Sequence, residues 1–255
     1  MEFTLDPSLL LLLGGVAFLA GFIDTLAGGG GLITIPALML AQLPPIQALA
    51  TNKLQGTFGS LTATLTLLRK RQMTFAEVRT ACIASFIGAA FGALVVQFID
   101  ASALAVLIPF VLGFIALYFL LAPSAGDIER RPRLGSRAHT GIVVPVIGFY
   151  DGFFGPGTGS FFSLSEVALR GRTLIRATAH AKAMNFASNA ASLMVFLLGG
   201  KIIWLVGLTM GLGQLLGAYL GSLAVIGGGA RLIRPVIVLV CFAMLGRYLY
   251  QAGYF

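Results

Sequence analysis

The chain has few charged residues and very few cysteines and histidines. Only 10% of its 255 residues are charged, 58% are hydrophobic, and the mean hydropathy is +0.95. An ordinary soluble domain has about 25% charged residues, and so few charges could not cover this much apolar surface in water. A soluble enzyme and a nucleic-acid-binding module are therefore both excluded. The composition predicts a polytopic integral membrane protein.

Motifs for catalysis and metal binding are absent as well. The sequence contains no HExxH, CxxC, GxSxG or GxxxxGK[ST] pattern, so neither an enzyme nor a metal or organic cofactor is expected. Cys82 and Cys241 each lie in an apolar run, which indicates no disulfide framework. The N-terminus offers Glu2 and Asp6 but no basic residue before Leu9. The first apolar run is therefore expected to be a retained span and not a signal peptide.

Apolar runs of about 20 residues, the length that crosses the hydrocarbon core of a bilayer, occur eight times. They cover residues 8–27, 46–68, 75–98, 102–122, 141–158, 174–199, 202–226 and 231–250. Two shorter apolar pieces, 31–43 and 159–170, each follow a glycine cluster, where a helix is expected to break. The hydrophilic residues 123–140 are predicted to form a basic cytoplasmic linker between a first repeat at 1–122 and a second at 141–255.

The two halves of the sequence are similar to each other. A shift of 127 residues places Asp24 on Asp151, and a shift of 129 places Lys53 on Lys182. An ordered set of matches that includes charged residues is hard to obtain by chance. We therefore predict an all-α polytopic membrane protein with two repeat-related halves, each with four long spans plus one short, glycine-broken segment.

The lysine and arginine residues indicate the orientation of the spans. If only eight spans cross, these residues divide 10 inside to 5 outside; if the two short pieces also traverse, they divide 13 to 2, and in both cases two lie within spans. The positive-inside rule favours the second arrangement. It gives each half an odd number of crossings, and so predicts inverted repeats, an architecture typical of transporters. Full crossing and a re-entrant hairpin both stay open for the short pieces.

Four ionisable residues in the predicted spans form two repeat-related pairs: Asp24 with Asp151 and Lys53 with Lys182. Each costs at least ~2.5 kcal/mol at the bilayer centre, so each is expected to face a cavity or a partner. The aspartates have two interpretations, as coupling groups or as structural partners of the lysines. Lysines, amide side chains and free glycine N–H groups at helix breaks together predict a site for a small oxyanion.

Three further ionisable residues are interpreted differently. Glu166 is expected to form an ion pair with Arg170, four residues later on a helix. His180 has two interpretations, a hydrogen-bonded histidine or a carrier of coupling protons. His139 is expected to be exposed to solvent in the linker.

Four segments carry a resemblance to a known family. Residues 21–36 (GFIDTLAGGGGLITIP) and 48–55 (ALATNKLQ), with 148–159 (GFYDGFFGPGTG) and 181–189 (AKAMNFASN) in the second half, resemble the two halves of the sulfite exporter TauE/SafE family. The resemblance covers about residues 8 to 250. It implies a permease for sulfur-containing oxyanions, such as sulfite and organosulfonates, without a metal or organic cofactor.

The predicted substrate contacts lie on the two motif halves. They are Asn52, Lys53, His180, Lys182 and Asn185, together with Gly29, Gly30, Gly157 and Thr158 of the glycine loops. His180 is aligned with Thr51, and Thr158 with Gly31, so the two halves are expected to be chemically unequal.

The leading hypothesis is a secondary transporter, an exporter of small sulfur oxyanions such as sulfite or sulfoacetate, that works by alternating access. The alternatives are an uncoupled anion channel or facilitator, and a membrane scaffold whose buried charges are structural. The expected location is the inner cell membrane, with multiple spans. The expected partners are a small anionic substrate and the lipid bilayer, but no nucleic acid; a homodimer stays open.

Overall fold

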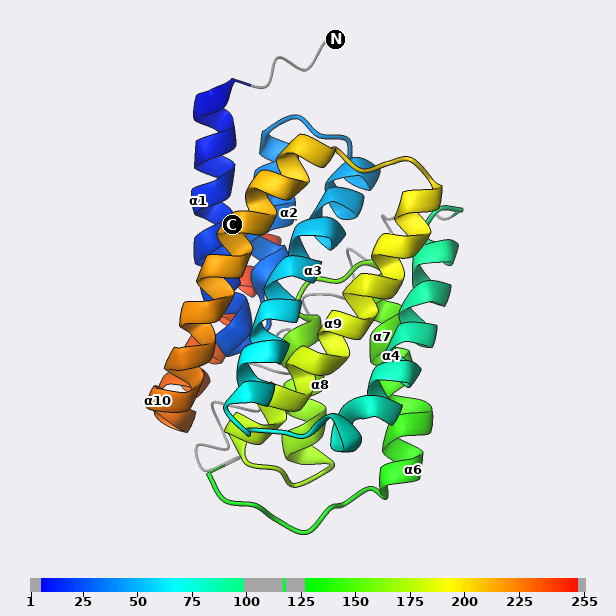
Figure 1. Cartoon of the computed structure of the whole chain (residues 1–255), viewed down its shortest axis with the longest axis vertical. Coiled ribbons are helices and arrows are strands. Elements are labelled where there is room, and N and C mark those ends of the chain that lie inside the picture. Colours follow the sequence, from blue (N-terminus) through cyan, green and yellow to red (C-terminus); the bar gives the residue numbers. More distant parts are fainter. Residues whose placement is uncertain (1–5, 99–116, 118–126, 252–255) are drawn as a thin grey trace.

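A computed structural model describes residues 6–98, 117 and 127–251, and all regular elements in this part of the chain are helices (Figure 1). They are α1 (Pro7–Ala27), α2 (Gly30–Leu40), α3 (Pro45–Arg69), α4 (Phe75–Val95), α6 (Ser136–Ala138), the π-helical turn η1 (His139–Val143), α7 (Val144–Phe153), α8 (Thr158–Ala168), α9 (Leu174–Leu198) and α10 (Trp204–Gln251). The predicted span 102–122 lies almost entirely outside the described residues. The all-helical architecture agrees with the predicted class of membrane protein.

Local capping chemistry explains where several helices begin. Asp6 caps α1, where its carboxylate accepts a hydrogen bond from the Ser8 N–H at 3.2 Å. Hydrogen bonds from the Ser8 hydroxyl and N–H lower the pKa of the Asp6 carboxyl. Thr74 and Glu77 form a reciprocal capping box at the start of α4, and Thr173 caps α9. These side chains satisfy N–H groups that the first helical turn leaves without partners.

The predicted spans correspond closely to α1, α3, α4 and α9, with ends that differ by at most three residues. Three helical segments of the described chain are long and apolar enough to cross a membrane: Pro7–Ala27, Phe75–Val95 and Trp204–Gly228. The helices α3 and α9 have 25 residues each, which is long enough to cross, but they carry many buried polar side chains.

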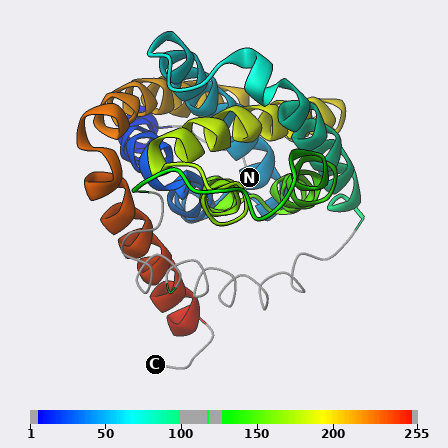
Figure 2. The same cartoon turned by 90° about the horizontal axis from the view of Figure 1, so that it is seen from below.

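Two predicted boundaries are wrong. The spans 202–226 and 231–250 form one continuous helix, α10, although glycines occupy positions 227–229 between them. A glycine costs a helix only about 1 kcal/mol, which is less than leaving backbone groups unpaired in apolar surroundings. Figure 2 shows that the C-terminal part of α10 turns away from the helix bundle. The predicted span 141–158 ends earlier than expected, because α7 stops at Phe153.

The short helices α2 and α8 turn back along the chain. Each has 11 residues, which is about 16 Å long and half the thickness of a hydrocarbon core. Leu38 near the end of α2 packs with Leu13 and Ala17 near the start of α1. The helices α1 and α2 therefore form a hairpin, and α2 leads back toward the end of the molecule where α1 began.

The first helix of each half packs on the fourth helix of the other half. Figure 1 shows α1 beside α10 and α7 beside α4. Glycines make this close approach possible: a Cβ atom on Gly217 would lie 1.9 Å from the carbonyl oxygen of Phe18, and one on Gly92 would lie 2.1 Å from that of Phe149. Small residues at such crossings let helix backbones touch. The helices α3 and α9 pack against each other and also contact α10 and α4 respectively.

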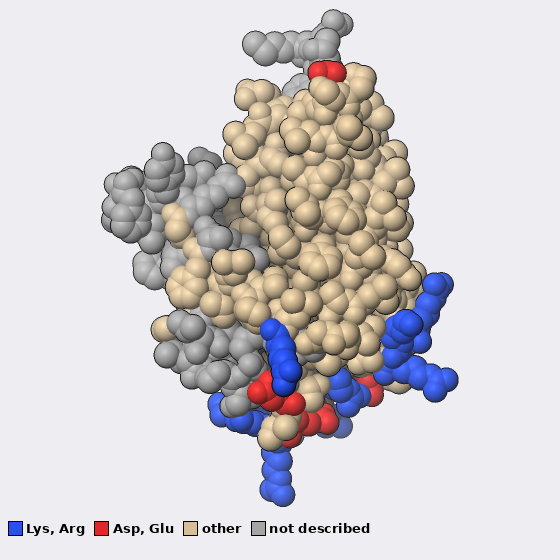
Figure 3. Space-filling model, turned by 90° about the vertical axis from the view of Figure 1, so that its left-hand side faces the viewer, with Lys and Arg blue, Asp and Glu red and all other residues tan. Residues whose placement is uncertain are grey.

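Charge is distributed unevenly over the molecule. On the face shown in Figure 3, lysine and arginine side chains gather at one end, and an acidic side chain lies at the other. The basic end is the one where α3 finishes and α9 starts, since Leu67 and Leu174 share one apolar cluster there. This separation is the pattern that the positive-inside rule describes.

We predict that Gly217→Ala destabilises the bundle, because the new methyl group would overlap the carbonyl oxygen of Phe18. Such overpacking costs about 1–3 kcal/mol. Thermal unfolding of the detergent-solubilised protein, followed by the fluorescence of its single tryptophan, Trp204, should show a lower Tm. Gly15→Ala is the matched control on α1, since nothing lies within 4 Å of a Cβ atom there. Equal Tm values for the two variants would contradict the tight α1–α10 contact.

Candidate functional site

Two helix breaks meet in the middle of the molecule. The first follows α1 at Gly28 (φ 77°), and the second follows α7 and includes Gly155 (φ 94°). Both conformations are left-handed and favour glycine. A Cβ atom on Gly28 would lie 2.1 Å from the backbone nitrogen of Ser160, and the Ser160 hydroxyl donates a hydrogen bond to the Ala27 carbonyl. The two short helices α2 and α8 thus begin next to each other.

Lys53, on α3, pairs with Asp151 at the break after α7. Its Nζ lies 2.9 Å from Asp151 Oδ1 and donates a hydrogen bond of 2.5 Å to the Asp151 carbonyl oxygen. The Thr158 hydroxyl donates a second hydrogen bond to Asp151 Oδ1 at 2.8 Å. Lys53 is 1% exposed and Asp151 is 2% exposed.

Lys182, on α9, pairs in the same way with Asp24 at the other break. Its Nζ lies 2.8 Å from Asp24 Oδ2 and also donates to the Asp24 carbonyl oxygen. The N–H of Gly30, the first residue of α2, donates to Asp24 Oδ1 at 3.0 Å. Each lysine therefore receives its counter-ion from the other half of the chain. This is the geometry that a structural role for the aspartates requires, because a buried charge needs a hydrogen-bonded partner.

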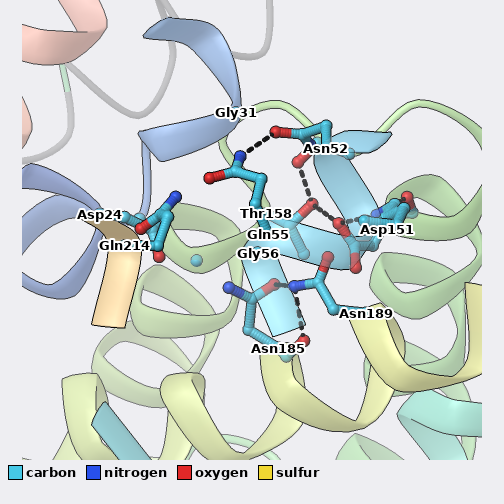
Figure 4. A pocket seen from close by; sticks show the side chains of 14 residues that line it. Asp24, Gly31, Asn52, Gln55, Gly56, Asp151, Thr158, Asn185, Asn189 and Gln214 are labelled. Carbon is cyan, nitrogen blue, oxygen red and sulfur yellow. Dashed lines mark hydrogen bonds and ion pairs between the residues drawn. The ribbon is translucent and has the colours of Figure 1, made fainter. Parts of the chain in front are cut away.

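A small polar cavity of about 30 Å³ lies beside these ion pairs (Figure 4). Both halves of the chain line it. The lining residues are Asp24, Gly28, Gly31, Asn52, Lys53, Gln55, Gly56, Asp151, Gly155, Thr158, Gly159, Asn185, Asn189 and Gln214. Its net formal charge is −1, from one lysine and two aspartates, and Lys182 behind Asp24 brings the group to zero.

The amide side chains of the cavity have a fixed polarity. Asn52 Oδ1 accepts hydrogen bonds of 2.6 Å from both the Thr34 hydroxyl and Gln55 Nε2. Asn185 Oδ1 accepts one of 3.1 Å from Asn189 Nδ2. These bonds use the amide oxygens of Asn52 and Asn185. Their amide nitrogens have no partner among the described residues, which leaves N–H donors for a molecule in the cavity.

The structure brings part of the predicted site together. Four of the nine predicted substrate contacts line the cavity, Asn52, Lys53, Thr158 and Asn185, as do both aspartates, Asp24 and Asp151. Lys182 is buried behind Asp24, and Gly30 donates to Asp24 from outside the lining. Gly29 and Gly157 precede α2 and α8 as their N-caps and do not line the cavity.

His180 lies away from this group. Its Nε2 is 3.6 Å from Glu77 Oε2 at the start of α4, toward the basic end. On a helix, residues two apart point about 200° away from each other, so His180 and Lys182 face different neighbours.

Gln214 is the lining residue that the sequence analysis missed. It comes from α10, is 3% exposed, and lies beside Asp24 in Figure 4. A single amide within the apolar run 202–226 was the signal that could have identified it. Gln55, Gly56 and Asn189 also line the cavity, each on the same face of α3 or α9 as a predicted residue.

Two expectations outside the cavity are wrong. Glu166 pairs with Arg172 at 2.6 Å and not with Arg170, whose Nη1 donates to the Leu134 carbonyl instead. The helix α8 ends at Ala168, so the helical spacing of four residues does not hold there. His139 is 2% exposed, and its Nε2 lies 3.2 Å from the Ser165 hydroxyl. It is buried because the helical segment already begins at Ser136.

No group of three or more His, Cys, Asp or Glu side chains among the described residues is arranged to hold a metal ion. The cavity offers N–H donors from Asn52 and Asn185, the paired charges of Lys53 and Asp151, and buried acceptor oxygens on Gln55, Asp151 and Gln214. The N–H donors can form hydrogen bonds with an anion.

Comparison with known proteins gives one consistent family. The model of a family described as "Sulfite exporter TauE/SafE" matches residues 13–248 of the chain. A "Probable membrane transporter protein" of Haemophilus influenzae is 49% identical over 97% of both chains. "Probable membrane transporter protein ORF9" of Sinorhizobium sp is 48% identical over 94% of this chain and 92% of its own. "Probable membrane transporter protein YfcA" of Escherichia coli K12 is 46% identical over 98% of this chain and 93% of its own.

No solved structure matches the chain. The matched region includes both helix breaks, both ion pairs and every residue that lines the cavity. The chain is therefore an all-helical membrane protein that belongs to the sulfite exporter TauE/SafE family.

Proposed function

We propose that this protein is a secondary transporter that exports small sulfur-containing oxyanions, such as sulfite or sulfoacetate, across the inner cell membrane by alternating access. The central observation behind the proposal is the polar cavity between the two halves, where two helix breaks, two buried lysines and unpaired amide donors meet. The description of the family and the names of the relatives, which are all probable membrane transporters, support the general class.

The ends of the short helices favour an anion. The helices α2 and α8 both start at the cavity, where Gly31, Thr158 and Gly159 belong to the lining. The N-terminus of a helix carries a partial positive charge and unpaired N–H groups, so it attracts negative charge. Half-helices that point their N-termini at a site near the midplane are a recurring feature of transporters for anionic substrates.

The amide donors suit an oxyanion. Asn52 lies on α3 and Asn185 on α9, and each has an amide nitrogen available to the cavity. Oxygens of a sulfite or sulfonate group accept hydrogen bonds from such nitrogens. We assign the first contacts with the substrate to these two side chains.

The lysines have unequal roles in this proposal. Lys53 lines the cavity, and an incoming anion can compete with Asp151 for its Nζ. Lys182 lies behind Asp24 and contributes its charge from a greater distance. This difference between the two lysines agrees with the difference between Thr158 and Gly31, which occupy aligned positions in the two halves but have different side chains.

Alternating access rests on the inverted repeat, which the helix lengths support. The helices α2 and α8 have 11 residues each, and α3 and α9 have 25 each. The first helix of each half packs on the fourth helix of the other half, α1 on α10 and α7 on α4. This arrangement fits two related units around one cavity. In this proposal the cavity opens to the two sides of the membrane in turn.

The central test is transport by the purified protein in proteoliposomes. We expect uptake of labelled sulfite or sulfoacetate against its gradient when a pH gradient is imposed, with weaker uptake of sulfate and thiosulfate. Flux that follows only the electrochemical gradient of the anion, whatever the pH gradient, would favour the uncoupled channel. Absence of both binding and flux for the whole panel would remove the proposed substrate class and favour the scaffold.

Asn185→Asp tests the amide donors. The variant keeps the oxygen that accepts from Asn189 but replaces the amide nitrogen with a negatively charged oxygen. We expect the affinity for sulfoacetate, measured by calorimetry, to fall at least about tenfold, since one charge-assisted hydrogen bond is worth about 1.5–3 kcal/mol. Gln97→Glu, which makes the same chemical change at an exposed position outside the cavity, should bind like the wild type. An unchanged affinity of Asn185→Asp would exclude Asn185 from the binding site.

Paired substitutions distinguish a transporter from a scaffold. Lys182→Met alone leaves the charge of Asp24, whose side chain is 17% exposed, without its counter-ion. The Tm should fall, because breaking a buried pair costs up to about 3–5 kcal/mol. The double variant Lys182→Met/Asp24→Asn should regain most of the lost Tm and still transport poorly. Arg172→Met/Glu166→Gln removes a buried pair outside the cavity and should keep its transport activity. Wild-type transport by the Lys182/Asp24 double variant would show that this pair is only structural.

A further inference from the structure

The two aspartates of the cavity differ in how their carboxylate oxygens are satisfied. Both oxygens of Asp24 accept a hydrogen bond, Oδ1 from Gly30 N–H and Oδ2 from Lys182. In Asp151, Oδ1 accepts from both Lys53 and Thr158, whereas Oδ2 is buried and has no partner among the described residues. A buried carboxylate oxygen without a donor is unfavourable, so each such atom calls for an explanation.

We propose that Asp151 Oδ2 is the binding site of a coupling proton that is taken up together with the anion. This inference rests on the proposed function and adds the coupling ion to it. A hydronium ion of the surrounding water supplies the proton: one of its O–H bonds breaks and leaves a water molecule, and an O–H bond forms at Asp151 Oδ2. Proton and anion then share the cavity and move together.

Charge balance in the cavity explains why proton and anion bind together. Lys53 is the counter-ion of Asp151 at 2.9 Å. An anion that enters the cavity and contacts Lys53 adds a second negative charge beside this carboxylate, and like charges at short distance in a buried site repel strongly. Protonation of Oδ2 removes one of the two negative charges. The new O–H group can also donate a hydrogen bond to the anion.

Few other charged groups lie near Asp151. On α3 the facing charge is Lys53, and across the cavity Asp24 and Lys182 neutralise each other. The face of α4 that touches α7 includes small residues such as Ser85 and Ala89, whose side chains carry no titratable group.

The remaining titratable groups on the neighbouring elements lie away from the cavity or have partners of their own. On α8, Glu166 is bound to Arg172, and on α9, Arg176 pairs with Glu77 of α4. His180 Nε2 is buried without a hydrogen-bond partner among the described residues, and it lies 3.6 Å from Glu77, outside the cavity lining. His139 of η1 lies against Ser165, and the hydroxyl of Tyr150, next to Asp151 on α7, donates to the Pro156 carbonyl. Asp151 is therefore the ionisable side chain of this region with an oxygen that is still open to a proton.

The experiment measures protons bound per anion. The full-length protein in detergent is titrated with sulfoacetate at neutral pH, in two buffers whose heats of ionisation differ. The difference in apparent binding enthalpy gives the number of protons exchanged with the buffer. Sulfoacetate is fully ionised at this pH, so any proton taken up is bound by the protein. We expect uptake of about one proton per sulfoacetate by the wild-type protein.

The variants are Asp151→Asn and, as a control, Arg172→Met/Glu166→Gln, which removes an ion pair outside the cavity. We expect Asp151→Asn to bind sulfoacetate without proton uptake and the control to retain the uptake. In proteoliposomes with a pH-sensitive dye inside, a sulfoacetate gradient should acidify the lumen through the wild type and the control but not through Asp151→Asn.

Each other outcome overturns the inference. Binding by the wild type without proton uptake would exclude a coupling proton while leaving the proposed substrate class intact. Undiminished uptake by Asp151→Asn, or its loss in the Arg172→Met/Glu166→Gln control alone, would assign the proton to another group. If Asp151→Asn does not fold, infrared spectra of the wild type decide instead, since a protonated carboxyl band should appear when sulfoacetate is added, and its absence would reject the proposal. Failure to bind any anion of the panel would reject the proposed function itself.

Discussion

The centre of this molecule depends on the neutralisation of two buried ammonium groups. Lys53 and Lys182 are each 1% exposed, and an isolated charge in such a place would cost several kcal/mol. In both cases the carboxylate comes from the opposite half of the chain. The break after Asp151 adds a second acceptor, because the helix that would have used its carbonyl oxygen ends there. At the other break the Asp24 carbonyl oxygen accepts from both the Gly28 N–H and Lys182. The ion pairs and the helix breaks therefore depend on each other, because the lysines hold the broken ends together.

The two halves hold their aspartates in similar positions but with different hydrogen-bond donors. At Asp24 the second donor is a backbone N–H of α2, and at Asp151 it is the hydroxyl of Thr158. At the aligned positions on α3 and α9, the Thr51 hydroxyl accepts from the Ile203 N–H, while His180 faces Glu77. One half can thus carry a function that the other lacks.

Local patterns predicted the elements well, and contacts between distant segments less well. The ends of α1 and α4 follow from apolar runs bounded by capping residues such as Asp6 and Thr74. The polar residues on α3 and α9 could be identified because charge is costly in an apolar chain. Which aspartate meets which lysine depends on how helices more than 90 residues apart pack, and no local pattern contains that information. Gln214 reaches the cavity only because α10 packs against α3, and Arg172 replaces Arg170 because α8 ends before it.

Packing also limits which parts of the molecule can move. The contacts of α1 with α10 and of α7 with α4 are made by backbone on backbone, and a Cβ atom at Gly217 or Gly92 would already overlap a carbonyl oxygen. Such crossings have little freedom to slide without losing many close contacts. The polar layer between them is different, since it contains a cavity, and its ion pairs can exchange partners with a bound anion. In alternating access as proposed here, each glycine-packed pair moves as a unit, and Lys53 with Asp151 is the contact at which binding of the anion changes the balance between the two openings.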